Sequence, residues 1–131
     1  MTFTTAELQY LQAQVLGRLA TARPDGSLQN NPVGFHCDET AGTIDIRGRN
    51  LAATQKFANV ARTGVVAFVV DDLASRDPWV VRGVEVRGRA EATSDEHGEV
   101  IRIHPSRIIS WGLDPAHPGM SARAVDPSER K

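Results

Sequence analysis

The sequence has a single cysteine, few aromatic residues and no long hydrophobic run. One cysteine, Cys37, excludes an internal disulfide and fits a reducing compartment. The longest apolar run, residues 65–70, is far shorter than the roughly 20 residues that cross a bilayer, and the N-terminus lacks a signal-peptide pattern. Aromatic residues make up 5% of the chain, too few for a base-stacking platform. We therefore expect a soluble, cytoplasmic protein with no membrane or nucleic-acid partner.

Sequence patterns of hydrolases and metal enzymes are also missing. The chain contains no GxSxG, HExxH or GxxxxGK[ST] motif. A metal site at His36 and Cys37 would need two further ligands, and no CxxC or HxxxH spacing supplies them. Asp71 and Asp72 are adjacent carboxylates, but their place after a buried strand favours a strand-end role over acid–base catalysis. We predict no metal site and assign no catalytic side chain.

The composition fits one globular domain with a locally basic segment. The chain has 131 residues, of which 40% are hydrophobic and 24% charged, and its net charge is −1. Residues 47–89 nevertheless contain eight Arg or Lys against four Asp or Glu. Such a local positive field suits a small anionic ligand better than a nucleic-acid backbone. A set of solvated strand faces explains the excess equally well.

The N-terminal segment has the signals of a helix. Thr4 and Glu7 have the spacing of a capping box, and Phe3 and Leu8 that of a hydrophobic staple. Apolar residues continue at helical spacing as far as residue 16, and Gly17 then ends the pattern. This predicts a helix over residues 4–16.

The remainder reads mainly as short antiparallel strands joined by tight turns. Pro32 cannot donate a ladder hydrogen bond, so its strand should bulge or lie at an edge, and Pro105 should break the last strand. A second, short helix is expected over residues 50–61, with Asn50 as its N-cap. Strands are expected over residues 18–22, 27–37, 43–47, 65–70, 79–93 and 100–111, with a loop over 71–78.

These elements predict a mostly β (α+β) domain: a small six-stranded antiparallel β-barrel with an N-terminal helix and a short helix between strands 3 and 4. The chain has no room for the crossover helices that a parallel sheet needs. We expect the domain to cover residues 1–113. Residues 114–131 lack apolar periodicity and are expected to form a tail that is mobile or draped on a partner.

Arg82 breaks the alternation of the long strand over residues 79–93. Val80, Val84 and Val86 occupy the apolar face, and the alternation places Arg82 on that face too. A guanidinium there needs an anionic partner. A protein carboxylate and a ligand phosphate are both possible, so Arg82 is a candidate ligand-binding residue.

The segment between the third and fourth strands carries groups that can grip a phosphate. A hydroxyl, an amide and an ammonium group lie on one helical turn, just after two guanidinium groups. Plain surface charge would explain the lysine equally well. The residues concerned are Arg47, Gly48, Arg49, Thr54, Gln55 and Lys56.

Several stretches resemble the pyridoxamine-phosphate-oxidase-like superfamily, and particularly its actinobacterial branch of coenzyme F-420-dependent enzymes. They occur in the order and spacing of that family over nearly all of residues 17–113. No single stretch is diagnostic, but the ordered set is fairly specific. The stretches are GRLATARPDGSLQNNPVGF, TQKFANVAR, VVAFVVDD, RGVEVRGRAE and IRIHPSRIISWGL.

The resemblance implies a split-barrel homodimer with two cofactor clefts at the subunit interface. It also implies that Asn31, Pro32 and Val33 lie along the flavin or deazaflavin ring. The phosphate would be held by Lys56 with its neighbours Thr54 and Gln55, and Arg47, Gly48 and Arg49 would line that end of the cleft.

Two departures from the family pattern bear on function. The family usually has Asn-Pro after the second helix, where this chain has Thr63-Gly64, a change that should leave the cleft intact. The acidic, proline-containing C-terminal region replaces the substrate-binding region of true pyridoxamine phosphate oxidases, so pyridoxine chemistry is not expected.

The sequence therefore predicts a reductase in which reduced coenzyme F-420 transfers a hydride to a small unsaturated organic acceptor. Two alternatives remain: an FMN-dependent oxidoreductase using the same cleft, and a non-catalytic flavin or deazaflavin carrier. The residues alone separate neither the two cofactors nor the possible acceptors.

Overall fold

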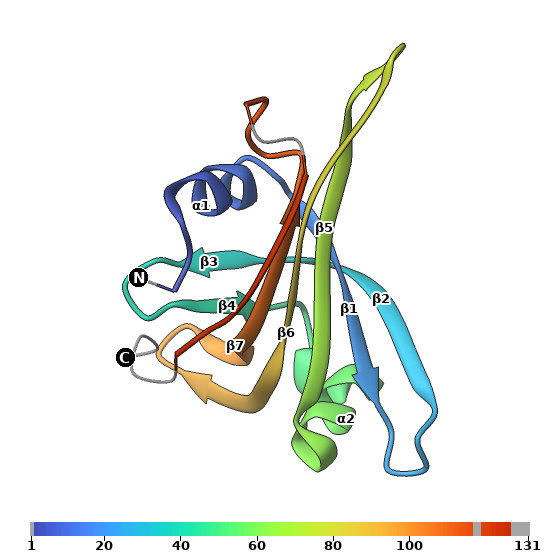
Figure 1. Cartoon of the computed structure of the whole chain (residues 1–131). Coiled ribbons are helices and arrows are strands. Elements are labelled where there is room, and N and C mark those ends of the chain that lie inside the picture. The colour runs from blue at the N-terminus through green and yellow to red at the C-terminus, as the bar shows by residue number, and fades with distance from the viewer. Residues whose placement is uncertain (1, 117–118, 127–131) are drawn as a thin grey trace.

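The computed structural model describes residues 2–116 and 119–126 and has a curved antiparallel sheet with one helix near each end (Figure 1). The elements in chain order are α1 Thr5–Gln12, β1 Leu16–Ala22, β2 Leu28–Gly34, β3 His36–Asp38, β4 Thr43–Ile46, the 3₁₀ turn η1 Leu51–Ala53, α2 Gln55–Thr63, β5 Val65–Arg76, β6 Trp79–Asp95, β7 Gly98–Trp111 and β8 Met120–Ala124.

The strand order explains why the sheet curls into a split barrel. Neighbouring strands follow the order β2-β1-β5-β6-β7-β4-β3, with β8 paired to β7. The two end strands, β2 and β3, are consecutive in the chain and are separated only by Phe35. Chain continuity at Phe35 therefore joins the opposite edges of the sheet. The predicted mostly β, antiparallel fold class with two helices is confirmed.

Pro32 lies where its chemistry predicts. It belongs to the edge strand β2 and pairs with Arg18 of β1. The strand predicted over residues 27–37 is divided, but the division falls at Phe35 and not at Pro32. An edge strand tolerates proline because its outer N–H has no ladder partner to lose.

The capping box of α1 is confirmed, although the helix is shorter than predicted. The Thr4 N–H donates to Glu7 Oε1 (2.9 Å) and the Glu7 N–H donates to Thr4 Oγ1 (3.1 Å). The helix ends at Gln12, and Leu16 instead pairs with Gly34 at the start of β1. The strand ladder takes residues whose apolar spacing alone fits a helix.

The loop predicted over residues 71–78 is wrong. β5 continues to Arg76 and β6 begins at Trp79, so the two strands form a hairpin arm that projects beyond the barrel (Figure 1). Most residues of this segment are exposed, although Asp72 and Ser75 are half-buried. Its backbone pairs with β6, with a bulge between Leu73 and Ser75 and with Asp72 opposite Arg82. The polar composition of residues 71–78 predicted an exposed segment but not its strand pairing.

Pro105 does not break the last strand, because β7 accommodates it with a bulge. Gly88 pairs with Pro105 and Arg87 pairs with Arg107, so Ser106 is an extra residue. The Ser106 hydroxyl donates to the Arg87 carbonyl (3.0 Å). A Cβ on Gly88 would lie 2.2 Å from the His104 carbonyl oxygen, so glycine permits this close approach.

The prediction of a tail after residue 113 is wrong for the part of it that forms β8. Met120–Ala124 pairs with β7, and Val125 is buried and donates its N–H to the Ser106 carbonyl (2.9 Å). Arg123 donates to both carboxylate oxygens of the buried Glu7 (2.5 and 2.8 Å). β8 needs little apolar pattern, because its backbone pairing with β7 and the Arg123–Glu7 ion pair hold it in place. Residues 117–118 and 127–131 of the predicted tail lie outside the described residues.

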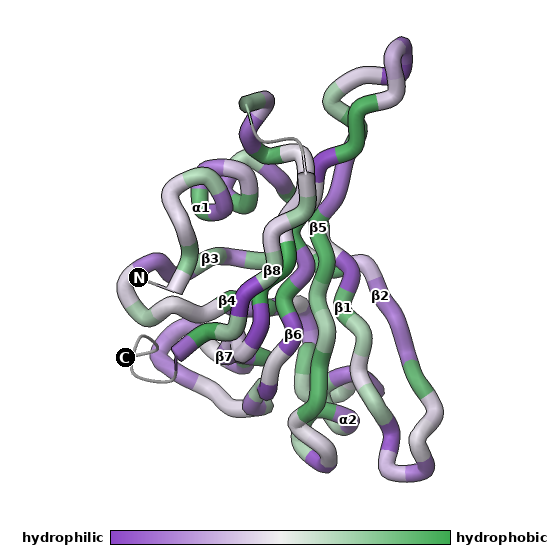
Figure 2. Tube along the Cα trace, in the orientation of Figure 1, coloured by the Kyte–Doolittle hydropathy of each residue, from purple (hydrophilic) through white to green (hydrophobic). Residues whose placement is uncertain are grey.

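The core lies inside the curl of the sheet, against α1 and the turn before α2. Hydrophobic residues follow β5 and β6 through the centre of the molecule (Figure 2). No helix in the described chain is both long and apolar enough to span a bilayer. The largest fully buried side chains include Leu11, Leu19, Ile44, Ile46, Leu51, Phe68, Ile101, Ile103 and Ile108.

Candidate cofactor-binding site

Helix α2 begins one turn later than the sequence predicts. Asn50 adopts a left-handed conformation (φ 54°) and makes no side-chain cap. Thr54 caps the helix instead: its hydroxyl donates to the Leu51 carbonyl (2.6 Å) and accepts from the Phe57 N–H (3.3 Å). Lys56 therefore lies in the first turn, where the helix dipole favours an anion.

A chain of side-chain amides connects α2 to the edge strand β2. Gln55 Nε2 donates to Asn59 Oδ1 (2.8 Å), and Asn59 Nδ2 donates to Gln29 Oε1 (3.1 Å) and to Thr21 Oγ1 (3.0 Å). Gln29 Nε2 in turn donates to Asn31 Oδ1 (2.8 Å). Because Asn59 is fully buried, the connection is part of the folded interior. It brings the predicted phosphate turn beside the predicted ring segment.

The predicted ring segment lies on the outer strand of the sheet. Val33 is buried, Asn31 is half-buried and Pro32 is exposed. β2 has β1 as its only strand neighbour among the described residues. One backbone edge of this segment thus has no strand partner among the described residues.

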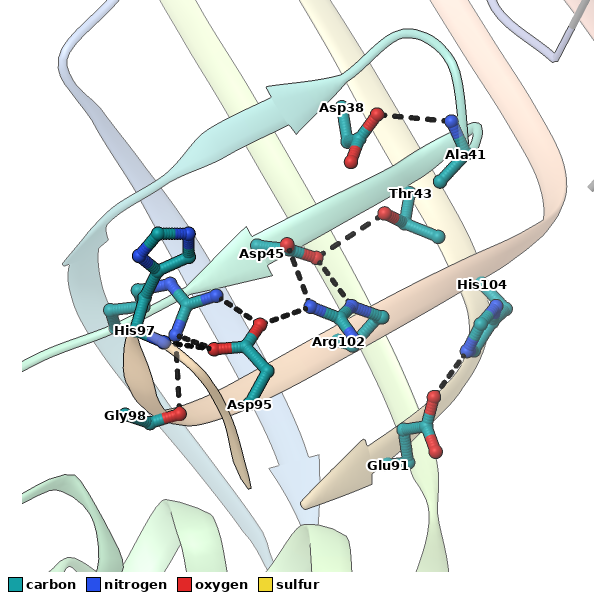
Figure 3. A network of polar contacts seen from close by, with 11 residues as sticks. Asp38, Ala41, Thr43, Asp45, Glu91, Asp95, His97, Gly98, Arg102 and His104 are labelled. Carbon is teal, nitrogen blue, oxygen red and sulfur yellow. Dashed lines mark hydrogen bonds and ion pairs between the residues drawn. The ribbon is translucent and has the colours of Figure 1, made fainter. Parts of the chain in front are cut away.

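Arg47 pairs with Asp95, which belongs to the network of Asp45, Asp95 and Arg102 shown in Figure 3. Its guanidinium makes two hydrogen bonds to Asp95 (3.0 and 2.6 Å) and one to the Gly98 carbonyl (3.3 Å). Arg102 bridges Asp95 (2.9 Å) and the buried Asp45 (3.0 and 3.1 Å). Hydrogen bonds from Arg47, from the His97 N–H and from Arg102 hold the pKa of Asp95 well below its usual range. Arg47 therefore anchors its loop to the β6–β7 hairpin.

Two cations near α2 are available to a ligand. Arg49 is exposed beyond the exposed Gly48, and Lys56 is half-buried. Over residues 2–116 and 119–126, neither Arg49 nor Lys56 has a carboxylate partner. A cation without a protein partner beside a helix start can bind an anion at little cost in broken contacts.

Arg82 lies apart from the other predicted site residues. Its partner is the protein carboxylate of Asp72, bound through Nε (3.0 Å) and Nη2 (2.6 Å). The Tyr10 hydroxyl donates to the same carboxylate (2.9 Å), and the Arg82 guanidinium lies 5.3 Å from the Tyr10 ring centroid. Burial and the Asp72 hydrogen bond raise the pKa of Tyr10, while Arg82 lowers that of Asp72. This cluster joins α1 to the root of the arm, at the opposite end of the sheet from α2 (Figure 1).

A shallow apolar cavity of about 450 Å³ on the outer sheet face escaped the sequence analysis. Leu28 and Val65 are 74% and 50% exposed at its walls. The alternation of small residues with buried ones in β1 and β5 is the sequence signal that marks it. It is lined chiefly by Ala20, Ala22, Leu28, Val65, Ala67 and Arg87.

Among the described residues, no three His, Cys, Asp or Glu side chains are grouped as a metal site. Arg47 and Arg82 were both predicted to bind the cofactor, but each pairs with a protein carboxylate, and Arg82 also lies apart from the other predicted site residues. Long-range pairing selects these partners. Asp95, Asn59 and Gln29 organise the site and carry no motif by which the sequence could have identified them.

Comparisons with known proteins identify the family of this chain. Residues 3–127 match the family model of pyridoxamine 5'-phosphate oxidase. A 5a,11a-dehydrotetracycline/5a,11a-dehydrooxytetracycline reductase of Streptomyces rimosus is 48% identical over 122 residues, covering 87% of this chain and 86% of the relative.

Solved structures share the same fold. A conserved hypothetical protein of Mycobacterium tuberculosis superposes with a TM-score of 0.72 at 22% identity, covering 91% of each chain. A FAD-binding protein of Mycobacterium smegmatis superposes with a TM-score of 0.62 at 23% identity, covering 82% of this chain and 93% of its own. The family match, the close relative and the shared split-barrel architecture lead to one conclusion: the chain belongs to the pyridoxamine 5'-phosphate oxidase family.

Proposed function

We propose that the protein is a reductase that uses reduced coenzyme F-420 to reduce a small unsaturated organic acceptor. The observation that carries this proposal is the amide chain from Gln55 through Asn59 and Gln29 to Asn31, which joins a cationic helix start to an open strand edge. The named activity of the Streptomyces relative supports a reductase over a carrier.

In this proposal each part of the site has a separate task. Asn31, Pro32 and Val33 orient the deazaflavin ring, which when bound supplies the hydride. Lys56 and Arg49 contact the phosphate directly. The first turn of α2, shaped by the Thr54 cap and the Gln55–Asn59 bond, contributes backbone N–H groups to the phosphate.

Arg47 and Gly48 contribute by shaping the loop before α2. Arg47 is paired with Asp95, so it holds the loop without reaching the phosphate. Gly48 lies at an open part of this loop, where a ligand could approach the backbone. Among the described residues, only the Leu51 side chain would come as near as 4.0 Å to a Cβ built on Gly48.

The acceptor class follows from the relative. Its name describes reduction of the 5a,11a double bond of a dehydrotetracycline, which adds one hydride and one proton and gives a tetracycline. We propose that this chain reduces a comparable conjugated carbonyl compound, with the proton drawn from solvent.

We also propose a homodimer in which the outer-face cavity is covered by a second copy. The exposed Leu28 and Val65 beside small alanines form an apolar surface next to the site, and such surfaces mark interfaces. Sedimentation at micromolar concentration should give about twice the chain mass of 14.2 kDa. Ala67→Arg should convert the dimer to monomer, whereas Val15→Arg, at an exposed site before β1, should not. A monomeric wild-type protein that still binds cofactor contradicts the interfacial cleft.

The cofactor choice is tested by titrating the protein with F-420 and with FMN. F-420 should bind more tightly, because its oligoglutamate tail adds negative charge that the basic residues 47–89 attract. Raising the salt concentration should weaken F-420 binding more than FMN binding, because salt screens the extra charges. Equal or tighter FMN binding at low salt would favour the FMN-dependent alternative.

The same preparations test for reduction. With F-420 in its reduced form and 5a,11a-dehydrotetracycline as acceptor, oxidation of the cofactor should exceed the rate without protein. Tight cofactor binding without turnover over a panel of conjugated carbonyl compounds would identify a carrier instead.

A further inference from the structure

A groove along the β5–β6 arm, from Trp79 near its tip to Arg82 at its root, has no part in the cofactor-binding site described above. It is a cavity of about 430 Å³ between the arm and the turn that follows β7. A second cavity of about 240 Å³, facing α1, adjoins it, and the two share Arg82 and Leu113. Their combined size is in the range of ligand pockets. The lining of the larger cavity includes Trp79, Val80, Val81, Arg82, Gly112 and Leu113.

Close packing at two glycines fixes the segments beside this groove. A Cβ on Gly112 (φ 67°) would lie 2.2 Å from the Val81 carbonyl oxygen, and a Cβ on Gly83 would lie 2.3 Å from the Trp111 ring. The start of the turn therefore packs directly on the backbone of β6, and the Trp111 ring lies on Gly83. Of the two glycines, Gly112 belongs to the lining of the groove.

The two ends of the groove differ in chemistry. At the apolar end Trp79 is 69% exposed, and Val80 and Val81 are each 39% exposed, which is unusual for large apolar side chains that lie together. At the other end Arg82 is fixed in place by two bonds to Asp72. Nη1 of Arg82 has no hydrogen-bond partner in the described chain, so it can donate to a ligand.

This pattern selects a class of ligand. The Trp79 indole and aliphatic walls suit a flat, fused-ring body. Because Asp72 neutralises Arg82, the polar end favours a carbonyl or enol oxygen over a strongly anionic group. The Tyr10 and Gln14 side chains line the smaller cavity at the same end. Both donate hydrogen bonds to Asp72 (2.9 and 3.4 Å) and so help to hold the carboxylate that positions Arg82.

Strand pairing relates the position of the groove to that of the proposed ring segment. Pro32 pairs with Arg18 across β2 and β1, and Arg18 bonds Asp71 of β5 at 2.6 Å. Asp72, the next residue of β5, points to the opposite face of the strand and holds Arg82 there. The groove thus lies at the end of the sheet toward which the ring segment runs.

We propose that this groove is the acceptor-binding site, and that it takes a conjugated polycyclic carbonyl compound with its ring body against Trp79 and its oxygens toward Arg82. The identification of the ligand as the acceptor rests on the proposed reductase function. Binding in the groove can nevertheless be measured without any cofactor or turnover.

The test uses tetracycline as a ring compound in calorimetric titration and NMR of the cofactor-free protein. Tetracycline should shift the Trp79 indole N–H signal, which is assigned with Trp79→Phe. Trp79→Ala and Val80→Glu should each weaken tetracycline binding by about tenfold or more, since they remove apolar contact or place a charge in the groove. Val15→Glu, at an exposed apolar residue outside the groove, should leave it unchanged.

Cofactor titration and turnover distinguish the remaining outcomes. F-420 affinity should stay within about twofold in both groove variants, and with dehydrotetracycline as acceptor they should raise KM with little change in kcat. Tetracycline binding in the groove without turnover would retain the site and reject the reductase. Unchanged tetracycline affinity in both variants would overturn the proposal. Lost F-420 affinity would also overturn it by assigning the arm to the cofactor, as would dissociation of the dimer by assigning the groove to a second copy.

Discussion

Replacing Arg123 by methionine is expected to lower the free energy of unfolding by about 3–5 kcal/mol, the cost of breaking a buried ion pair from one side. Glu7 is 2% exposed and accepts two hydrogen bonds from Arg123. Without them its carboxylate keeps the Thr4 N–H as its remaining partner. The loss is large against the total stability of about 5–15 kcal/mol of an ordinary domain. Urea unfolding measures it.

Two matched variants make the Arg123 result specific. Arg87→Met breaks an exposed pair with Glu85 and should cost less than about 1 kcal/mol. The double variant Glu7→Leu with Arg123→Met removes both charges and should recover much of the single-variant loss. A loss for Arg123→Met no greater than that for Arg87→Met would show that the ion pair does not hold β8 in place.

Lys56→Ala is expected to weaken cofactor binding about tenfold to a hundredfold. If the ammonium contacts a ligand phosphate, the substitution removes a charge-assisted hydrogen bond worth roughly 1.5–3 kcal/mol. Stability of the cofactor-free protein should change by less than about 0.5 kcal/mol, because no carboxylate of the described chain pairs with Lys56. Calorimetric titration and a melting curve on one variant give both quantities.

The control for Lys56 is Arg62→Ala, which removes an exposed cation from the same helix. Its effect on cofactor affinity should be small and should vanish at high salt. Equal effects of the two substitutions would reduce Lys56 to a contributor to the general positive field. Loss of stability with unchanged affinity would mean that Lys56 contacts the protein instead.

Features that depend on near neighbours were determined by the sequence alone. The capping box needs only Thr4 and Glu7, and both of its hydrogen bonds form. Pro32 cannot donate to a ladder, which puts it on an edge strand. The ordered set of stretches identified the family because spacing along the chain reflects the order of the elements.

Tertiary structure alone decided which distant groups meet. The sequence showed that Arg82 needs an anionic partner, and the pairing of β5 with β6 determines that this partner is Asp72. Arg47 was predicted to line the phosphate end of the cleft, but the β6–β7 hairpin places Asp95 against it. Residues 71–76 of β5 and the residues of β8 lack the apolar alternation that predicts a strand. They form strands because ladder hydrogen bonds are made by the backbone, which carries no residue pattern. The groove beside Trp79 forms only where β6 and the turn after β7 meet. Gly112 contacts Val81 there, and the two residues are too far apart in the sequence for a local pattern to predict the contact.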